Sequence, residues 1–138
     1  MADRPRGVAA LAVFFGVGAV IAATSCVSLL FPGSALEPMW RLNPRARDAF
    51  ARMGPLAVAL LATVAVACAL SSFGLWRGAR WGHRLALVVL AVNLLGDITN
   101  LVLGVEPRAA FGVPIVAALL VFLASTPVRA LFGGRARE

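Results

Sequence analysis

The sequence predicts an all-α membrane protein, built as one antiparallel bundle of four transmembrane helices with a short interfacial helix in the first loop. Of its 138 residues, 61% are hydrophobic and only 14% are charged, and the mean hydropathy is +0.91. Those values lie outside the range of ordinary soluble domains. Four apolar runs have the length that a bilayer requires at ~1.5 Å of rise per residue. All 13 basic residues are arginine and occupy the short segments between or beside these runs, so contacts with lipid headgroups explain the net charge of +7 without nucleic acid.

The first transmembrane helix is predicted over residues 8–31. A cleaved signal peptide is the alternative, because Arg4 and Arg6 precede the apolar core and the sequence Ala-Thr-Ser-Cys at 23–26 is similar to a lipoprotein cleavage box. The residue three positions before Cys26 is alanine, however, and the apolar stretch continues to Phe31. We therefore expect the first helix to be retained.

The first loop combines helix breakers with a short amphipathic pattern. Pro32, Gly33 and Pro38 interrupt regular structure, and Trp40 is expected to anchor the chain at the membrane interface. An Asn-Pro pair at 43–44 is typical of a helix start. Small and apolar residues then recur at i, i+3, i+4 and i+7, which predicts an interfacial helix over 44–53. The alternative is a lid or a docking surface for a partner.

The second transmembrane helix is predicted over 55–75. Small residues lie on one stripe of each of the first two helices, where they allow close packing. Cys26 and Cys68 lie at different depths without a CxxC motif, so we expect two buried thiols and no disulfide. The stripes are Ala12, Gly16, Ala19 and Ala23 in the first helix, and Ala62, Ala65, Ala69 and Ser72 in the second.

The turn between the second and third spans carries aromatic and basic residues together, which is typical of a cytoplasmic membrane boundary. His83 is the only histidine, so no metal site is expected, and we interpret it as a residue at headgroup level, with pH sensing as the alternative. With Trp40, the residues expected to anchor the protein at the interfaces are Trp76, Trp81, Arg77, Arg80 and Arg84.

The third transmembrane helix is predicted over 84–104 and is the most polar at depth. Asn93, Asp97 and Asn100 follow i, i+4, i+7 spacing and share one helix face with Gly96 and Gly104. A charged residue near a helix centre costs roughly 2.5–3.5 kcal/mol on insertion scales. We therefore expect this face to contact protein or water instead of lipid.

The fourth transmembrane helix is predicted over 113–131, with Pro114 in its first turn. The N-terminal segment, the turn between the second and third spans, and the C-terminal segment together hold eight arginines, against five in the other two connections. Both termini are therefore expected in the cytoplasm of a bacterial cell. The protein is expected to be multi-pass in the inner (plasma) membrane. The stretches around Phe50-to-Pro55 and Phe111-to-Pro114 are alike, which suggests two related hairpins. Such a repeat would place Thr24, Ser25 and Ser28 opposite Asp97.

Two functions are compatible with the Asn93, Asp97 and Asn100 cluster. The side chains could bond to neighbouring helices in a structural or accessory membrane subunit, with a homo-oligomer or a partner membrane subunit as the assembly. Alternatively, Asp97 could serve a small proton-linked or polar-solute carrier. Asp97 lies nearer the outer surface than the midplane, and four short spans leave little room for a substrate path, so the subunit is favoured. No HExxH motif, catalytic triad or phosphate loop occurs, so neither an enzyme nor a cofactor is predicted.

Four motifs carry a family resemblance: WRLNP at 40–44, GLWRGARWG at 74–82, Gly96-Asp97 with its two asparagines, and Val128-Arg129 with Phe132. On these the chain resembles a group of small uncharacterised bacterial integral membrane proteins with four helices. The resemblance implies the four-helix fold and carries no established activity. His83 stands where an aromatic or apolar residue is more usual in that group.

Overall fold

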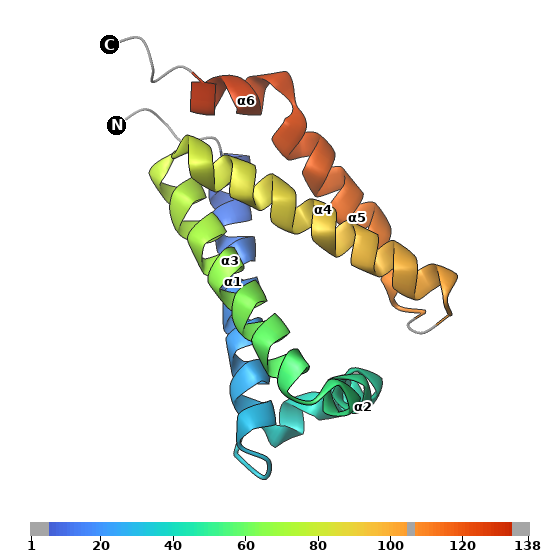
Figure 1. Ribbon diagram of the computed structural model, residues 1–138. Coiled ribbons are helices and arrows are strands. Elements are labelled where there is room, and N and C mark those ends of the chain that lie inside the picture. Colours follow the sequence, from blue (N-terminus) through green and yellow to red (C-terminus); the bar gives the residue numbers. More distant parts are fainter. Residues whose placement is uncertain (1–5, 105–106, 134–138) are drawn as a thin grey trace.

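The regular elements of the computed structural model, which describes residues 6–104 and 107–133, are all helices (Figure 1). Three of them, α1 (Arg6–Leu30), α3 (Pro55–Arg77) and α4 (Arg80–Val102), are long and apolar enough to cross a membrane. α5 (Ala109–Ala124) and α6 (Thr126–Gly133) meet the same criterion only as a bent pair. A 3-10 helix, η1 (Glu37–Leu42), and α2 (Pro44–Met53) connect α1 to α3. The described chain therefore has three helices that could cross a membrane, or up to four if the bent pair is one span.

Two helical hairpins diverge from a common end. α1 packs along α3, α4 packs along α5, and α3 meets α4 at the turn between them. Figure 1 shows the start of α1, the α3–α4 turn and α6 at one end, with the hairpins spreading apart toward the other. This arrangement is more open than a compact form of the antiparallel four-helix bundle that the sequence predicted. The main core accordingly gathers side chains from five helices near the shared end: Val8, Leu11, Ala12, Phe15, Cys68, Leu75, Ala86, Leu90, Val116, Leu123, Val128 and Phe132.

The α3–α4 turn is only two residues long. Gly78 adopts the left-handed conformation (φ 67°) and its N–H donates to the Leu75 carbonyl at 3.1 Å, while the Ala79 N–H donates to the Gly74 carbonyl at 2.8 Å. This pair of bonds is a Schellman ending, which satisfies the last carbonyls of α3. Beyond the turn, Gly82 lies directly against Gly74, so that a Cβ on either glycine would overlap backbone atoms of the other helix.

The fourth predicted span, 113–131, differs from the structure at both ends. It begins earlier, at Ala109, and is interrupted at Ser125, where the chain becomes extended and α6 leaves at 51°. The physical cause of the break is Pro127, which has no N–H to donate to the Leu123 carbonyl four residues earlier and whose ring disfavours a continuous helix.

The predicted repeat of the two hairpins is not matched in detail. Pro55 occupies the first position of α3, where a missing N–H costs nothing, whereas Pro114 lies inside α5 as its sixth residue. The early start of α5 therefore places the two prolines at different points of their helices.

The packing seam between α1 and α3 follows the predicted stripe of α1 at Ala12, Gly16 and Ala19, and departs from the predicted stripes elsewhere. Ala23, Ala62 and Ala69 are exposed, while their neighbours Ala22, Leu61 and Cys68 are buried, one position around each helix. Alanines occur on several faces of both helices, so small size alone does not mark the face that packs. One predicted contact is present, because the Ser72 hydroxyl donates to the Ala12 carbonyl at 2.7 Å.

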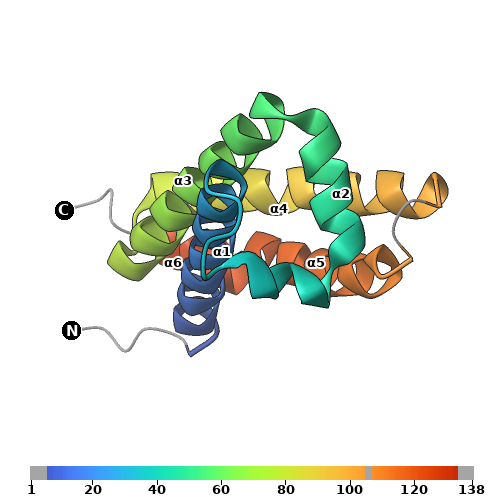
Figure 2. The same cartoon turned by 90° about the horizontal axis from the view of Figure 1, so that it is seen from below.

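α2 has the bounds that the sequence predicted. The Asn43 carboxamide oxygen accepts the Ala46 N–H at 3.1 Å, and Pro44 takes the first helical position. Gly54, with φ 57°, ends α2 and turns the chain into α3. None of the α2 residues is buried. Seen from below, α2 lies at the end of the first hairpin and extends beneath the second (Figure 2).

Candidate functional site

The C-terminal half of α4, away from the α3–α4 turn, carries the polar cluster that the sequence predicted. We call Asn93, Asp97 and Asn100 the polar face. The Asn93 amide donates to the Asp97 carboxylate at 3.3 Å, and both asparagines are exposed while Asp97 is half-buried. Within the described part of the chain, the Asn100 side chain has no hydrogen-bond partner. The polar face therefore has unused bonding capacity.

The polar face continues a stripe that is buried in the N-terminal half of the same helix. At 100° per residue, the buried residues Gly82, His83, Ala86 and Leu90 lie on the same side of α4 as Asp97. In the N-terminal half this side packs into the core. In the C-terminal half it is only partly covered, because Asp97 is half-buried while Asn93 and Asn100 are exposed.

Asp97 lies against α5, and a glycine makes the approach possible. A Cβ on Gly112 would stand 2.7 Å from one carboxylate oxygen of Asp97. The predicted neighbours in α1 are not brought to Asp97: the Thr24 hydroxyl donates to carbonyls of its own helix, and the Ser28 hydroxyl accepts a bond from Trp40. Ser25 is buried in the first hairpin.

His83 and Arg80 tie α4 to the last helices, which sequence reasoning missed. Nε2 of His83 is 2.8 Å from the Leu123 carbonyl oxygen, and the ring stacks on Phe132 with centroids 4.8 Å apart. A carbonyl only accepts, so Nε2 carries the proton. Arg80 donates through Nε to the Phe132 carbonyl at 2.8 Å and through Nη2 to the Gly133 carbonyl. His83 is therefore buried among protein groups, while its depth at headgroup level stays a prediction.

Trp40 is also more buried than an interfacial anchor. It is 7% exposed, its Nε1 donates to the Ser28 hydroxyl at 2.9 Å, and its ring meets Phe50 edge-on at 6.1 Å. Its indole N–H thus finds its partner inside the protein. Trp76 and Trp81, by contrast, are about half exposed, as an anchor requires.

The basic residues expected at the interfaces have different surroundings. The Arg77 guanidinium lies 5.3 Å from the centroid of the Phe73 ring, and Arg84 is exposed. On the opposite side, the Glu37 carboxylate pairs with Arg47, and Arg108 at the start of α5 donates to the Leu42 carbonyl at 2.8 Å. That last bond joins the two hairpins away from their shared end.

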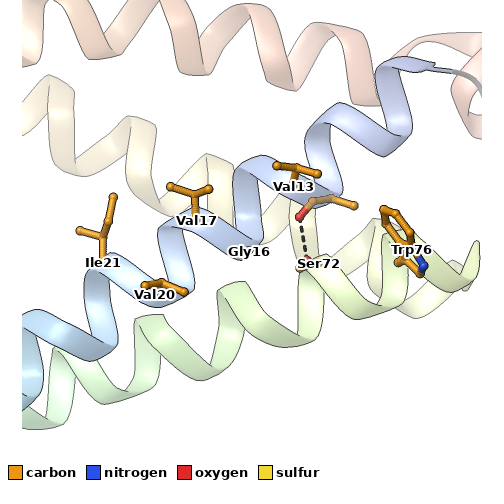
Figure 3. A pocket seen from close by; sticks show the side chains of 8 residues that line it. Val13, Gly16, Val17, Val20, Ile21, Ser72 and Trp76 are labelled. Atoms are coloured by element: carbon orange, nitrogen blue, oxygen red, sulfur yellow. Dashed lines mark hydrogen bonds between the residues drawn. The ribbon is translucent and has the colours of Figure 1, made fainter.

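A groove of about 450 Å³ runs along α1 and α3 on the first hairpin (Figure 3). Its lining is almost wholly apolar, and Figure 3 shows Trp76 at the end nearest Val13. The lining residues are Ala12, Val13, Gly16, Val17, Val20, Ile21, Ser72 and Trp76.

Metal-binding and redox sites are not formed by the described residues. No group of three histidine, cysteine, aspartate or glutamate side chains comes together among residues 6–104 and 107–133. Cys26 and Cys68 are buried and unpaired, with the Cys26 thiol 3.6 Å from the Val58 carbonyl oxygen.

Comparison of the chain with protein-family models, with curated proteins and with solved structures finds no match. The functional argument therefore depends on the geometry above.

Proposed function

We propose that the chain is a four-span protein of a bacterial inner membrane that serves as a structural or accessory subunit of a larger membrane assembly. α1, α3 and α4 supply three spans, and α5 with α6 supplies the fourth as one bent span. α2 lies on the outer membrane surface, which is supported by its lack of buried residues. Both termini are cytoplasmic by the distribution of arginine.

The observation that carries this proposal is the polar face of α4, of which Asn93 and Asn100 are exposed and Asp97 is half-buried. Of the apolar window of α4, 11% is buried within the chain, against 39% for α1. A lipid-exposed carboxylate would cost roughly 2.5–3.5 kcal/mol, more than the ~0.6 kcal/mol that one interhelical polar bond returns. Asn93, Asp97 and Asn100 together offer a neighbouring helix several bonds.

Cross-linking tests this proposal with a matched control on the same helix. In a background with Cys26→Ser and Cys68→Ser, Asn100→Cys places one thiol on the polar face, and Leu95→Cys places one on the opposite, exposed face of α4. A short reagent that joins a thiol to any neighbouring group on photoactivation, applied to native membranes, should cross-link the Asn100→Cys chain to a second copy or to one partner of fixed mass. Leu95→Cys should give no discrete product.

A polar face that contacts only lipid would give equal cross-linking, or none, at both positions, and that result would refute the subunit proposal. As an independent measurement, Asp97→Leu should lower the oligomer size or the stability in detergent, because it removes the carboxylate from the contact.

The alternative is a small proton-linked or polar-solute carrier that uses Asp97. It is favoured by one observation: the Asp97 carboxylate accepts a bond from the Asn93 amide at 3.3 Å, and Asn93 is exposed. In a carrier, Asp97→Asn abolishes transport and leaves assembly intact. A single cysteine at position 97 would then react quickly with a membrane-impermeant thiol reagent added from outside, whereas a packed contact would protect it until detergent is added.

A further inference from the structure

We infer that the cavity between α2 and the α1–α3 hairpin binds an aminophospholipid of the surrounding bilayer, with its ammonium group at Asp48. The cavity belongs to the first hairpin, so the inference goes beyond the assembly role of the polar face on α4 and does not depend on it. It uses only the placement of this hairpin in a membrane.

The cavity lies at the end of the first hairpin that is remote from the α3–α4 turn (Figure 1). It has a volume of about 610 Å³ and is lined by the end of α1, by η1, by α2 and by the start of α3. Ligand sites in proteins have volumes of about 300–1,000 Å³. The space is therefore large enough for a headgroup together with the first part of an acyl chain.

Much of the lining is apolar and comes from several elements. Leu30 belongs to α1, Phe50 to α2 and Val58 to α3, and the buried ring of Trp40 in η1 meets Phe50 edge-on. Leu30 is 53% exposed although it is a large apolar side chain. Hydrocarbon is the material that satisfies such a lining, so the ligand needs an apolar part.

The charged side chains of the lining leave one negative charge uncompensated. Glu37 and Arg47 form an ion pair that joins η1 to α2. The third charged group, Asp48, makes neither a hydrogen bond nor an ion pair with any residue that the structure describes. A primary ammonium group complements this carboxylate with a positive charge and with N–H donors.

The arginines next to the cavity favour a ligand that carries a phosphate as well. Arg45 and Arg52 are exposed on α2 and do not line the cavity. They would repel a simple cation, whereas they attract the phosphate groups of lipids. An ethanolamine phospholipid carries an ammonium group and a phosphate side by side, so it suits charges of both signs.

The Ser28 hydroxyl indicates a ligand with oxygen acceptors. Ser28 lines the cavity, is 4% exposed and accepts the Trp40 N–H at 2.9 Å. Its own proton finds no acceptor among residues 6–104 and 107–133. A buried donor without a partner is costly, and the ester or phosphate oxygens of a phospholipid would accept this proton.

Tryptophan quenching tests the site, because Trp40 lines the cavity. The chain has three tryptophans, so Trp76→Phe with Trp81→Phe leaves Trp40 as the single reporter. The protein is placed in phosphatidylcholine vesicles that contain increasing fractions of one lipid brominated on its acyl chains. The brominated lipids are phosphatidylethanolamine, phosphatidylcholine and phosphatidylglycerol, which differ only in the headgroup.

We expect brominated phosphatidylethanolamine to quench Trp40 half-maximally at a mole fraction roughly fivefold lower than the other two lipids, the upper end for an exposed ion pair. Asp48→Asn should remove this preference, while Arg45→Gln, outside the lining, should keep it. Ala51→Phe fills the cavity and should also remove it. Ala49→Phe is the matched control, because Ala49 is equally exposed on α2 and does not line the cavity.

Equal quenching by the three lipids would overturn the inference. This comparison can also be made with the unsubstituted chain, so it needs no variant to fold. A preference for phosphatidylglycerol would show that the arginines select an anionic lipid instead, and a preference that survives Ala51→Phe would place the lipid elsewhere. Saturable quenching by water-soluble 4-bromophenethylamine, without any preference among the lipids, would assign the cavity to a soluble amine and refute the lipid.

Discussion

The contact between Gly74 and Gly82 makes a prediction whose size follows from the structure. A Cβ added at Gly82 would stand 2.5 Å from the Gly74 carbonyl carbon and 2.9 Å from the Leu75 nitrogen, whereas ordinary contacts of a Cβ begin at 3.4 Å. These atoms belong to backbone and cannot rotate away. In Gly82→Ala the ends of α3 and α4 must therefore separate by roughly 1 Å, which loosens the buried side chain of Leu75 and costs about 1–3 kcal/mol of unfolding free energy.

Gly96→Ala is the matched control, since it makes the same chemical change in the same helix. A Cβ at Gly96 meets no atom within 4 Å. Alanine is favoured over glycine within a helix by about 0.5–1 kcal/mol, so this variant should be equally or more stable. The two substitutions are thus predicted to have opposite signs.

Unfolding in mixed micelles of a mild detergent and increasing dodecyl sulfate, followed by circular dichroism, measures both variants against the unsubstituted protein. The midpoint for Gly82→Ala should move to less dodecyl sulfate, and that for Gly96→Ala should stay or move to more. If Gly82→Ala is as stable as Gly96→Ala, the two helices do not approach each other as closely as described.

Two further predictions use the same unfolding assay, and a third uses amide exchange. Trp40→Phe keeps a six-membered aromatic ring but leaves the buried Ser28 hydroxyl without its donor, so it should cost about 1–2 kcal/mol of unfolding free energy. Adding Ser28→Ala to this variant should cost little more. Additive losses would mean that the bond contributes nothing. Arg80→Gln removes the guanidinium that bonds to the carbonyls at the end of α6, so amide exchange in α6 should become faster while exchange in α1 and α3 stays the same. Unchanged exchange in α6 would contradict this role of Arg80. Gly112→Ala displaces only the flexible Asp97 carboxylate and should change stability by less than about 1 kcal/mol; a larger loss would show that α5 is packed more tightly at this point.

Local signals in the sequence were sufficient to locate the first four α-helices approximately, though not the broken fourth span. The Asn-Pro pair at 43–44 and Gly54 bound α2, and the apolar runs correspond to α1, α3 and α4, because caps and hydrophobic length act within a few residues. The grouping of Asn93 with Asp97 was likewise predictable, since both lie on one helix at i, i+4 spacing.

The environment of single side chains was less predictable, because it is set by residues distant in sequence. Trp40 is buried by Ser28 and Phe50, and nothing in its own neighbourhood distinguishes such a tryptophan from an interfacial anchor. The predicted partner of Asp97 was wrong for a related reason. The repeat suggested α1, whereas a glycine in α5 allows the Asp97 carboxylate to approach that helix. The GLWRGARWG motif did contain a usable signal, since glycines at 74 and 82 flank a short turn and permit close helix contact.

His83 shows how one local rule and one distant contact combine. Pro127 leaves the Leu123 carbonyl without its helical donor, and an unpaired carbonyl at this buried position would be costly. The His83 imidazole supplies the missing donor from α4 at 2.8 Å, and Arg80, three residues earlier, bonds to the last carbonyls of α6. The break in the fourth span and the polar residues at the start of α4 are therefore one feature. A proline that appeared to mark only the end of a helix also explains why the single histidine is buried.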